Sequence, residues 1–393
     1  MQVTETKELF FFDQLIFAEN FCNFAKEKEK IKSCINHSEC LKLYGPRNFG
    51  KTSLVKNIIA KEWEAKEPEK RLVVYADFYS VTSLQDISLE LTKAFNKAIG
   101  PKYNLIDKSF AWLKLLKKVR PLWSPDLSGN GLGEFSLTTE KSEHIVDFEI
   151  ILENIHNLQK SGKFNFLIIL DEFQEIYKVK KAEALLRGAL QLFELKIPIV
   201  ILGSKQHLLK NIFENPRAPF YSWGSTIEFH PIAYEEYHQY IEERFQKIKK
   251  THSLETSIFL QKKLNHIPES INRFCAYLCR DEKNSIITPQ IIEKKMEDFI
   301  DSTRSIYENI YSTFTSSERK ILNVIAQKGE AQNVLGKDFL LEVKGVSKSG
   351  VSKIMLTLLN QSFLSMKFSK ESEIIYWMTD PFLSFFIKKH KQV

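Results

Sequence analysis

Residues 41–56, LKLYGPRNFGKTSLVK, decide the fold of this 393-residue chain. A short apolar run ends at Tyr44, and the octapeptide that follows, GPRNFGKT, fits the pattern GxxxxGK[ST] at every fixed position. Beyond it, Leu54, Val55, Ile58 and Ile59 recur with the spacing of one helix face. A buried strand, a glycine-containing loop and a helix in this order are the context in which the pattern forms a phosphate-binding loop, so we expect one here rather than a chance turn.

The residue types of this loop suit the binding of phosphate. Two glycines let the backbone N–H groups turn inward, and the helix start adds about half a positive charge. Lys51 is expected to reach the β- and γ-phosphates, and the Thr52 hydroxyl is expected to bind Mg²⁺. The residues expected to bind nucleotide are therefore Gly45, Pro46, Arg47, Asn48, Phe49, Gly50, Lys51, Thr52 and Ser53.

A second acidic site follows about 120 residues downstream, as hydrolysis would require. The run Phe164–Asp171, FNFLIILD, is typical of a buried strand and is followed by Glu172. We expect Asp171 to hold Mg²⁺ through water and Glu172 to act as general base toward the attacking water. An apolar run ending in Asp-Glu is a weak signal alone, and it gains weight from the phosphate-binding loop.

Three further segments fit the same sheet. Arg71–Phe78, Ile197–Gly203 and Thr226–Phe229 are apolar runs separated by helical stretches, which predicts a parallel sheet with its ligands at the carboxyl ends of the strands. Ser204 follows one of these runs. Its hydroxyl either senses the γ-phosphate or the water, or it merely ends the strand.

The composition is that of a globular protein with a modest positive surplus. Lys plus Arg number 56 and Asp plus Glu number 49, and residues 303–393 hold 13 basic and 8 acidic side chains. This surplus points mildly to an anionic partner for the C-terminal quarter. Five cysteines without a CxxC pair, an N-terminus without a basic start and no apolar stretch of membrane-spanning length indicate a reduced, cytoplasmic protein that is not bound to a membrane.

Several of these segments resemble one known family. GPRNFGKTSL, LIILDEFQEI and VILGSKQHLLKNIF are similar to segments of the archaeal-type ATPases, in the AAA+/STAND branch of P-loop proteins, which is related to origin-recognition initiators. The ending YWMTDPFLSFFI also resembles the family, in which it follows a winged helix. The resemblance spans about residues 15 to 390, and DEFQ and the DPFLxF-like ending are its more specific parts.

The resemblance implies ATP with Mg²⁺, a helical lid and two candidate arginines. The family usually has a PLYGR-like segment before the last strand, whereas this chain reads PFYSW, with Trp223 at the arginine position and Arg217 just upstream. Arg217 is either an arginine finger acting on a neighbouring subunit or a surface residue. In AAA+ lids an arginine near a helix start senses the γ-phosphate, and Arg273 is either that sensor or a solvated arginine.

From Thr315 onward the pattern predicts a winged helix-turn-helix. Ser316–Gln327, Lys337–Val343 and Ile354–Asn360 read as helices, with Ser316 or Ser317 as N-cap, and Phe363–Phe368 and Glu373–Met378 alternate like two strands. In that fold the third helix enters the major groove. The expected DNA contacts are Lys348, Ser349, Ser352 and Lys353, with Lys367 and Lys370 on the wing.

The sequence thus predicts an α/β P-loop NTPase with a parallel sheet, a helical lid and a C-terminal winged helix-turn-helix. Its expected parts are an AAA+-type ATPase core (1–230), a helical lid and linker (231–312) and a winged-helix domain (313–393). We expect ATP hydrolysis coupled to double-stranded DNA binding, or alternatively a nucleotide-dependent signalling switch whose winged helix docks a protein partner. The chain is also expected to have a homo-oligomer or a protein as a possible partner. Some members of the family carry a nuclease-like domain beyond the winged helix. As a third alternative, this chain is a truncated relative of those members, and we expect it to lack that domain because the sequence ends at Val393.

Overall fold

A computed structural model of the chain describes residues 9–17, 20–22, 24–103, 119–124, 134–139, 147–191, 197–281, 283–369 and 373–391. Their contacts divide them into two compact units. The core unit comprises Ala25–Gly45 and Lys51–Phe229, and the C-terminal unit comprises the described residues up to Phe24, the loop Pro46–Gly50 and the chain from His230 onward.

A five-stranded parallel sheet forms the centre of the core unit. All of its neighbouring strands run parallel, and their order is β2-β5-β6-β1-β7. The strands confirm the predicted ones: β1 (Cys40–Tyr44), β2 (Arg71–Asp77), β5 (Asn165–Asp171), β6 (Ile199–Gly203) and β7 (Ser225–Glu228). A separate antiparallel hairpin, β3 (Val119–Ser124) with β4 (Glu134–Thr139), lies between β2 and β5 in the sequence.

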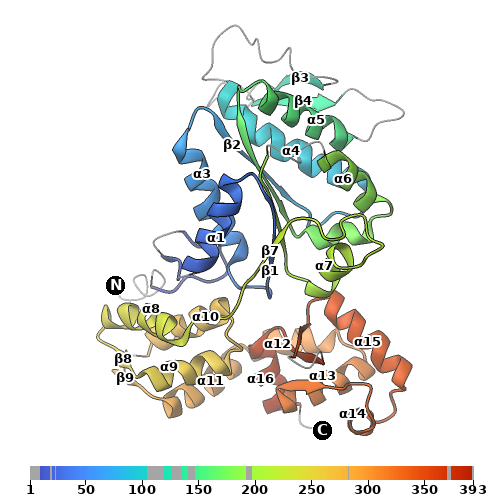
Figure 1. The fold of residues 1–393 in the computed structure, drawn as a ribbon. Helices are drawn as coiled ribbons and strands as arrows, with labels where there is room; N and C mark the ends of the chain where they lie inside the picture. Colours follow the sequence, from blue (N-terminus) through green and yellow to red (C-terminus); the bar gives the residue numbers. More distant parts are fainter. Residues whose placement is uncertain are drawn as a thin grey trace. The chain divides into compact units, whose positions relative to one another are not determined.

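Helices cover both faces of this sheet (Figure 1). On one face lie α1 (Ala25–Asn36) and α3 (Ala60–Lys66), and on the other lie α4 (Leu84–Tyr103), α5 (Asp147–Lys160), α6 (Ala182–Leu190) and α7 (Gln206–Phe213). Because β5 and β6 are central and covered on both sides, almost every residue in them is buried, whereas burial alternates along the edge strand β2. None of the helices described, the 20-residue α4 included, is long and apolar enough to cross a bilayer.

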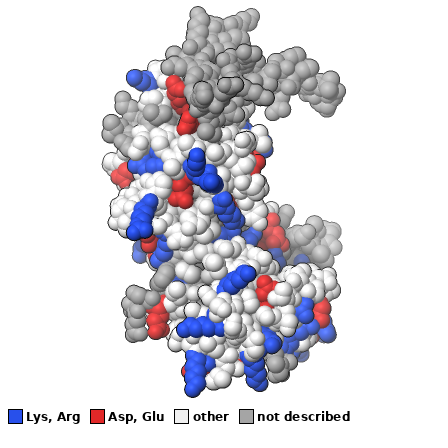
Figure 2. Space-filling view, turned by 90° about the vertical axis from the view of Figure 1, so that its right-hand side faces the viewer, with Lys and Arg blue, Asp and Glu red and all other residues white. Residues whose placement is uncertain are grey.

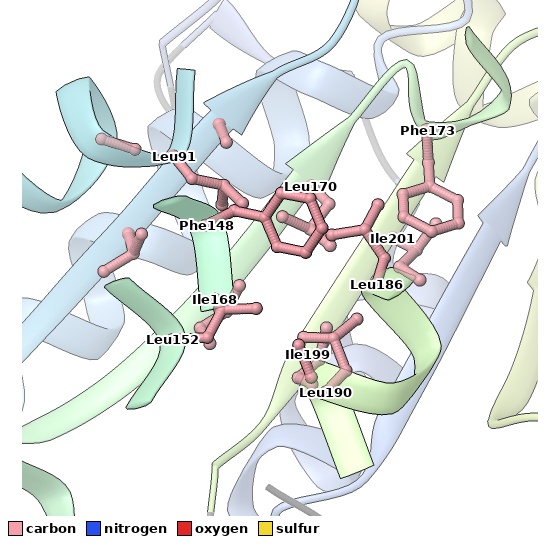
Figure 3. Packing of buried hydrophobic residues seen from close by; sticks show 14 of the residues in the cluster. Leu91, Phe148, Leu152, Ile168, Leu170, Phe173, Leu186, Leu190, Ile199 and Ile201 are labelled. Carbon is pink, nitrogen blue, oxygen red and sulfur yellow. The ribbon is translucent and has the colours of Figure 1, made fainter. Parts of the chain in front are cut away.

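One face of the sheet and the helices α4, α5, α6 and α7 build the main core, part of which Figure 3 shows from close by. Ile168 and Leu170 of β5 and Ile199 and Ile201 of β6 point to the same side and are at most 1% exposed. They pack against apolar side chains from the helices: Leu91 of α4, Phe148 and Leu152 of α5, and Leu186 and Leu190 of α6. Because successive side chains of a strand point to opposite faces, Ile169 and Asp171 of β5 point to the other face of the sheet, toward the helix that follows the phosphate-binding loop.

The helix after the phosphate-binding loop departs from the regular helix that its apolar spacing predicts. It begins as α2 (Lys51–Leu54), passes through a π-helical turn (Val55–Ile59) and continues as α3. Such single π turns are rare and often occur at functional sites, and a π-helical turn is wider than an α-helical one. The apolar spacing carries no signal for it, because Leu54, Val55, Ile58 and Ile59 also fit one face of a regular α-helix.

Four helices of the C-terminal unit form the lid that was expected after the sheet. They are α8 (Tyr234–Gln246), α9 (Leu254–Lys263), α10 (Pro268–Cys279) and α11 (Pro289–Ser302), accompanied by the short parallel strands β8 (Thr251–His252) and β9 (Ile286–Ile287). As its sequence suggests, α10 begins with a proline in its first turn, where no backbone N–H is needed. Cys275 and Cys279 lie one turn apart on this helix and are both buried.

A winged helix completes the C-terminal unit, as predicted. The helix α12 (Arg304–Ser312) leads into it, and its sheet has the order β10-β12-β11. The remaining elements are α13 (Ser316–Lys328), β10 (Glu330–Gln332), α14 (Lys337–Glu342), α15 (Lys348–Asn360), β11 (Leu364–Phe368), β12 (Ile374–Met378) and α16 (Pro381–His390). The third helix starts at Lys348, earlier than the apolar pattern alone suggested, because Ser347 caps it by accepting a hydrogen bond from the Gly350 N–H.

The N-cap of α13 differs from the predicted one. Thr315, not Ser316 or Ser317, caps the helix, because its hydroxyl accepts the N–H of Glu318 (3.3 Å) and the Glu318 carboxylate accepts the N–H of Thr315 (2.7 Å). This reciprocal capping box needs Glu three residues after the cap, and only Thr315 has that spacing.

Removing this cap should loosen α13. We expect Thr315→Ala to cost about 1 kcal/mol of helix stability, because the hydroxyl no longer accepts the Glu318 N–H and no longer donates to the Glu318 carboxylate (2.8 Å). Amide hydrogen exchange in α13, followed by mass spectrometry, should accelerate about five-fold, which corresponds to about 1 kcal/mol. The control is Thr313→Ala, since the Thr313 hydroxyl only donates to the Ile310 carbonyl in the preceding helix. Equal exchange in both variants would contradict the assignment of the cap.

Candidate functional site

The loop between β1 and α2 has the geometry of a phosphate-binding loop. Gly50 has φ +81° and Asn48 has φ +63°, so the loop uses left-handed backbone that glycine and asparagine tolerate best. The Lys51 ammonium donates to the Gly45 carbonyl oxygen at 2.8 Å, and the residue is only 7% exposed. The lysine is therefore held close to the start of its own loop.

A hydrogen bond joins the start of the loop helix to the end of β5. The Thr52 hydroxyl donates to Asp171 Oδ2 at 2.8 Å, across 119 residues of sequence. Asp171 is 4% exposed, and its other oxygen, Oδ1, accepts the backbone N–H of Glu172 at 2.9 Å. The two residues expected to hold Mg²⁺ thus lie side by side in the core unit.

A third donor to Asp171 comes from β2 and was not predicted. The phenol of Tyr75 donates to Asp171 Oδ2 at 2.7 Å. Burial, followed by the negative charge of Asp171, raises the pKa of Tyr75 well above its usual range, so its hydroxyl stays protonated. Among the described residues, the Asp171 carboxylate thus accepts three hydrogen bonds.

Glu172 lies directly beyond β5 in an uncommon backbone conformation. Its φ of 48° and ψ of 38° are left-handed, which costs a non-glycine residue free energy and occurs often at functional sites. Its Oε2 accepts hydrogen bonds from the Ser204 hydroxyl at 2.9 Å and from the Gln174 amide. The predicted base and the predicted sensor are therefore in direct contact.

A buried polar cluster continues from Gln174 to Lys205, the residue after Ser204. Gln174 is fully buried, and its amide also donates to Glu175 Oε1 at 3.4 Å. That carboxylate pairs with Lys205 at 2.7 Å and with Lys178. Burial opposes the ionisation of Glu175, but the hydrogen bonds from both lysines hold its pKa below the usual range. Glu175, which lies shortly after Glu172, is thereby linked to Lys205, which follows Ser204.

The donor set at the strand ends suits Mg²⁺ and a phosphate chain. Thr52 and Asp171 offer a hydroxyl and a carboxylate, and Mg²⁺ is usually bound through one or two such oxygen ligands together with waters and substrate phosphates. Lys51 and the loop backbone supply positive charge and N–H donors for the phosphates. Glu172 supplies a carboxylate at the same end of the sheet.

The candidate arginine finger lies on the surface of the core unit. Arg217 is exposed, its backbone N–H donates to Asn215 Oδ1 at 3.0 Å, and its guanidinium has no hydrogen-bond or ion-pair partner within the described residues. At the position where the family usually has arginine, Trp223 is only 9% exposed and packs edge-on against Phe220. The indole therefore fills the core where a charged side chain could not remain unpaired.

The candidate lid sensor is engaged within the C-terminal unit. The Arg273 guanidinium pairs with Asp13 and, at 3.2 Å, with Glu269 one turn earlier on α10. Burial opposes its charge, but the nearby carboxylates of Asp13 and Glu269 outweigh burial and raise the pKa of Arg273. The alternative of a solvated arginine does not describe this residue, which is 30% exposed and has two carboxylate partners.

The expected DNA contacts all lie on the exposed side of α15. Lys348, Ser349, Ser352 and Lys353 are exposed, and neither lysine ammonium has a partner within the described part of the chain. Figure 2 shows Lys and Arg side chains spread over the visible face. On the wing, Lys367 pairs with Glu330 at 2.7 Å and lies over the Trp377 ring, whereas Lys370 falls outside the described residues.

Two residues of the site, Tyr75 and Gln174, were not predicted, and only Tyr75 could be found through the register of the sheet. Asp77 of β2 pairs with Asp171 of β5, so Tyr75 lies on the same face one step before it. Gln174 follows the acidic pair in the sequence, but nothing local indicates that it turns back to Glu172.

Comparison with known proteins agrees with this architecture. Residues 21–261 match the model of a family described as an ATPase domain predominantly from Archaea, and residues 305–389 match a probable winged helix domain. A curated relative, an uncharacterized ATP-binding protein of Methanocaldococcus jannaschii, is 31% identical over 145 residues, which are 35% of this chain and 38% of the relative. The chain thus covers well under half of that relative's length.

Two solved structures share the fold over nearly the whole chain. A Walker-type ATPase of Pyrococcus abyssi is 14% identical and superposes with a TM-score of 0.62, covering 97% of this chain and 99% of that one. The ORC2 protein of Aeropyrum pernix, in ADPNP–ADP complexes, is 15% identical with a TM-score of 0.54, covering 97% of each chain. At these identities the likeness concerns the fold.

Gly203 tests how tightly the strand ends are packed. A Cβ at this position would lie 2.3 Å from Gln174 Oε1 and 2.6 Å from Leu209 Cδ1. We expect Gly203→Ala to lower the free energy of unfolding by about 1 to 3 kcal/mol, because both side chains must move. Gly188→Ala is the matched control, since a Cβ there meets nothing within 4 Å in the helix α6. Thermal unfolding should shift downward for the first variant only, and equal midpoints would argue against the packing described.

Proposed function

The chain belongs to the family of ATPase domains found predominantly in Archaea, and on that premise we propose that it binds ATP with Mg²⁺ and hydrolyses it. The observation that carries the proposal is the contact between Thr52 and Asp171, with Glu172 directly beside it. A phosphate-binding loop alone serves many nucleotide-binding proteins. A carboxylate base adjacent to the metal-binding pair is what hydrolysis needs in addition.

The phosphate chain of ATP would be held by the residues from Gly45 to Ser53. Their backbone N–H groups and the helix start attract the anionic oxygens, and Lys51 would exchange its bond to the Gly45 carbonyl for the β- and γ-phosphates. Thr52 and Asp171 would hold Mg²⁺, which supplies positive charge to the phosphate oxygens. The ATP specificity follows from the family and from the lack of a guanine-reading NKxD motif in the sequence.

Glu172 would act as the general base. Within the described residues its Oε2 accepts two hydrogen bonds, while Oε1 accepts none and is open to a water. The water oxygen forms a bond to the γ-phosphorus, the bond to the β-γ bridging oxygen breaks, and Glu172 receives the water proton. Ser204 would orient the carboxylate through its 2.9 Å hydrogen bond.

Two arginines that do not belong to the strand ends, Arg217 and Arg273, would add positive charge near the phosphates. Arg217 is exposed and without a partner in the part of the chain described, which supports a role as arginine finger toward a neighbouring copy in a homo-oligomer. Arg273 would sense the γ-phosphate after leaving Asp13 and Glu269. This exchange would link the nucleotide state to the lid.

We further propose that the winged helix binds double-stranded DNA. The exposed lysines and serines of α15 support contacts to phosphates, and without an arginine on this face the binding would depend little on base sequence. We divide the chain accordingly into an ATPase core (1–230), a lid and linker (231–312) and the winged helix (313–393). ATP turnover in the first part would change the DNA affinity of the last.

The nucleotide site is tested by two substitutions. Lys51→Ala should abolish binding of a fluorescent ATP analogue, because the loop loses its phosphate-binding charge. Glu172→Gln should bind ATP but reduce its turnover about 100-fold or more, because the base is lost, so that ATP remains bound after gel filtration. Lys70→Ala and Glu214→Gln are controls, since both residues are exposed and belong to neither the loop nor the acidic strand end. Unchanged turnover in Glu172→Gln would refute the assignment of the base.

The DNA interface is tested by charge reversal. Lys348→Glu with Lys353→Glu should weaken binding to duplex DNA, measured by fluorescence anisotropy across a salt series. The slope of log affinity against log salt should become less steep by about 0.9 for each DNA phosphate that is no longer neutralised. Lys247→Glu with Lys294→Glu changes the net charge equally on exposed lid residues and should change neither value. Binding that is absent, or indifferent to both α15 lysines, would favour a winged helix that docks a protein.

A further inference from the structure

The carboxylate of Asp171 accepts one hydrogen bond that the motifs of the site do not account for. Thr52 belongs to the phosphate-binding loop, and the Glu172 N–H belongs to the acidic strand end itself. The third donor, the phenol of Tyr75, comes from β2 and bonds the same oxygen as Thr52, at 2.7 Å. The question is what this additional donor does.

The sheet explains how Tyr75 reaches Asp171. In the parallel register Tyr75 is level with Ile169, and Asp77 is level with Asp171. All four side chains therefore point to the same face, and the long phenol spans the two-residue step along the strands. The opposite face of β2, with Val74 and Ala76, is buried in the main core, which fixes the strand.

The ring of Tyr75 is in turn held by the helix that follows the phosphate-binding loop. The ammonium of Lys56, in the π-helical turn, lies 4.4 Å from the centre of the Tyr75 ring. Farther along the same helix and strand, the Arg71 guanidinium lies 4.3 Å from the Trp63 ring. Two cation–π contacts thus clamp β2 against the helix that carries Thr52.

We propose that Tyr75 is a positioning residue for the metal-binding carboxylate: it holds Asp171 in the orientation that receives Mg²⁺, and Lys56 holds Tyr75. This inference rests on the proposed function. The hydrogen bond comes from the sheet and not from the nucleotide, so it persists while Thr52 binds or releases its ligand. Partners that orient a metal ligand in this way typically contribute about 10- to 100-fold to metal affinity.

The conservative variant Tyr75→Phe tests the proposal, because it removes the hydroxyl and keeps the ring beneath Lys56. The affinity of a fluorescent ATP analogue is measured at a series of Mg²⁺ concentrations and in EDTA. We expect the Mg²⁺ concentration for half-maximal tight binding to rise about 10-fold, while the affinity in EDTA stays as in the unsubstituted chain. Lys56→Met should shift it in the same direction by a smaller factor.

Tyr79→Phe is the matched control. It makes the same chemical change two residues beyond β2, on a ring that is 62% exposed and whose hydroxyl has no partner within the described residues. It should leave the Mg²⁺ dependence unchanged. Three outcomes overturn the inference: an unchanged Mg²⁺ dependence in Tyr75→Phe, an equal loss of affinity in EDTA, or the same shift in Tyr79→Phe. If the unsubstituted chain shows no Mg²⁺-dependent binding at all, the proposed function fails as well.

Discussion

The hydrogen bond between Thr52 and Asp171 is the contact on which the rest of the site depends. It connects the loop after β1 with the end of β5, although these strands are not neighbours. β6 lies between them and contributes Ser204, and β2 lies on the far side of β5 and contributes Tyr75. The strand order alone therefore brings all of these groups to one edge, because parallel strands all end at the same edge of the sheet.

This arrangement carries costs that the surrounding structure offsets. Glu172 has left-handed backbone, and Gln174 Oε1 is buried without a hydrogen-bond partner among the residues that the structure describes. Each costs on the order of 1 to 3 kcal/mol and persists only where the packing around it is well determined. The buried core beneath β5 and β6, together with the ion pairs of Glu175, provides that support. Such local strain at Glu172, the proposed general base, is typical of functional sites.

Much of this could be predicted from the sequence, and the exceptions have a common cause. The phosphate-binding loop, the five strands and the winged helix follow local patterns of glycine, apolar runs and alternation. The contact of Tyr75 with Asp171 depends on the register between two strands, and one of the two partners of Arg273, Asp13, lies 260 residues away. The cap at Thr315 was missed by one residue, because the reciprocal bond with Glu318 decides between adjacent hydroxyl residues. Contacts between distant segments need the three-dimensional structure.

The account is tested most directly by a double-mutant cycle on Thr52 and Asp171. Thr52→Val, Asp171→Asn and the double variant are compared with the unsubstituted chain, and the affinity for an ATP analogue is measured with Mg²⁺ and in EDTA. If the two residues hold one metal ion together, each single change should remove most of the Mg²⁺-dependent affinity, and the double change should lose little more, with a coupling of about 1 kcal/mol or larger. Strictly additive losses, or losses that are equal in EDTA, would contradict a shared metal site at this edge of the sheet.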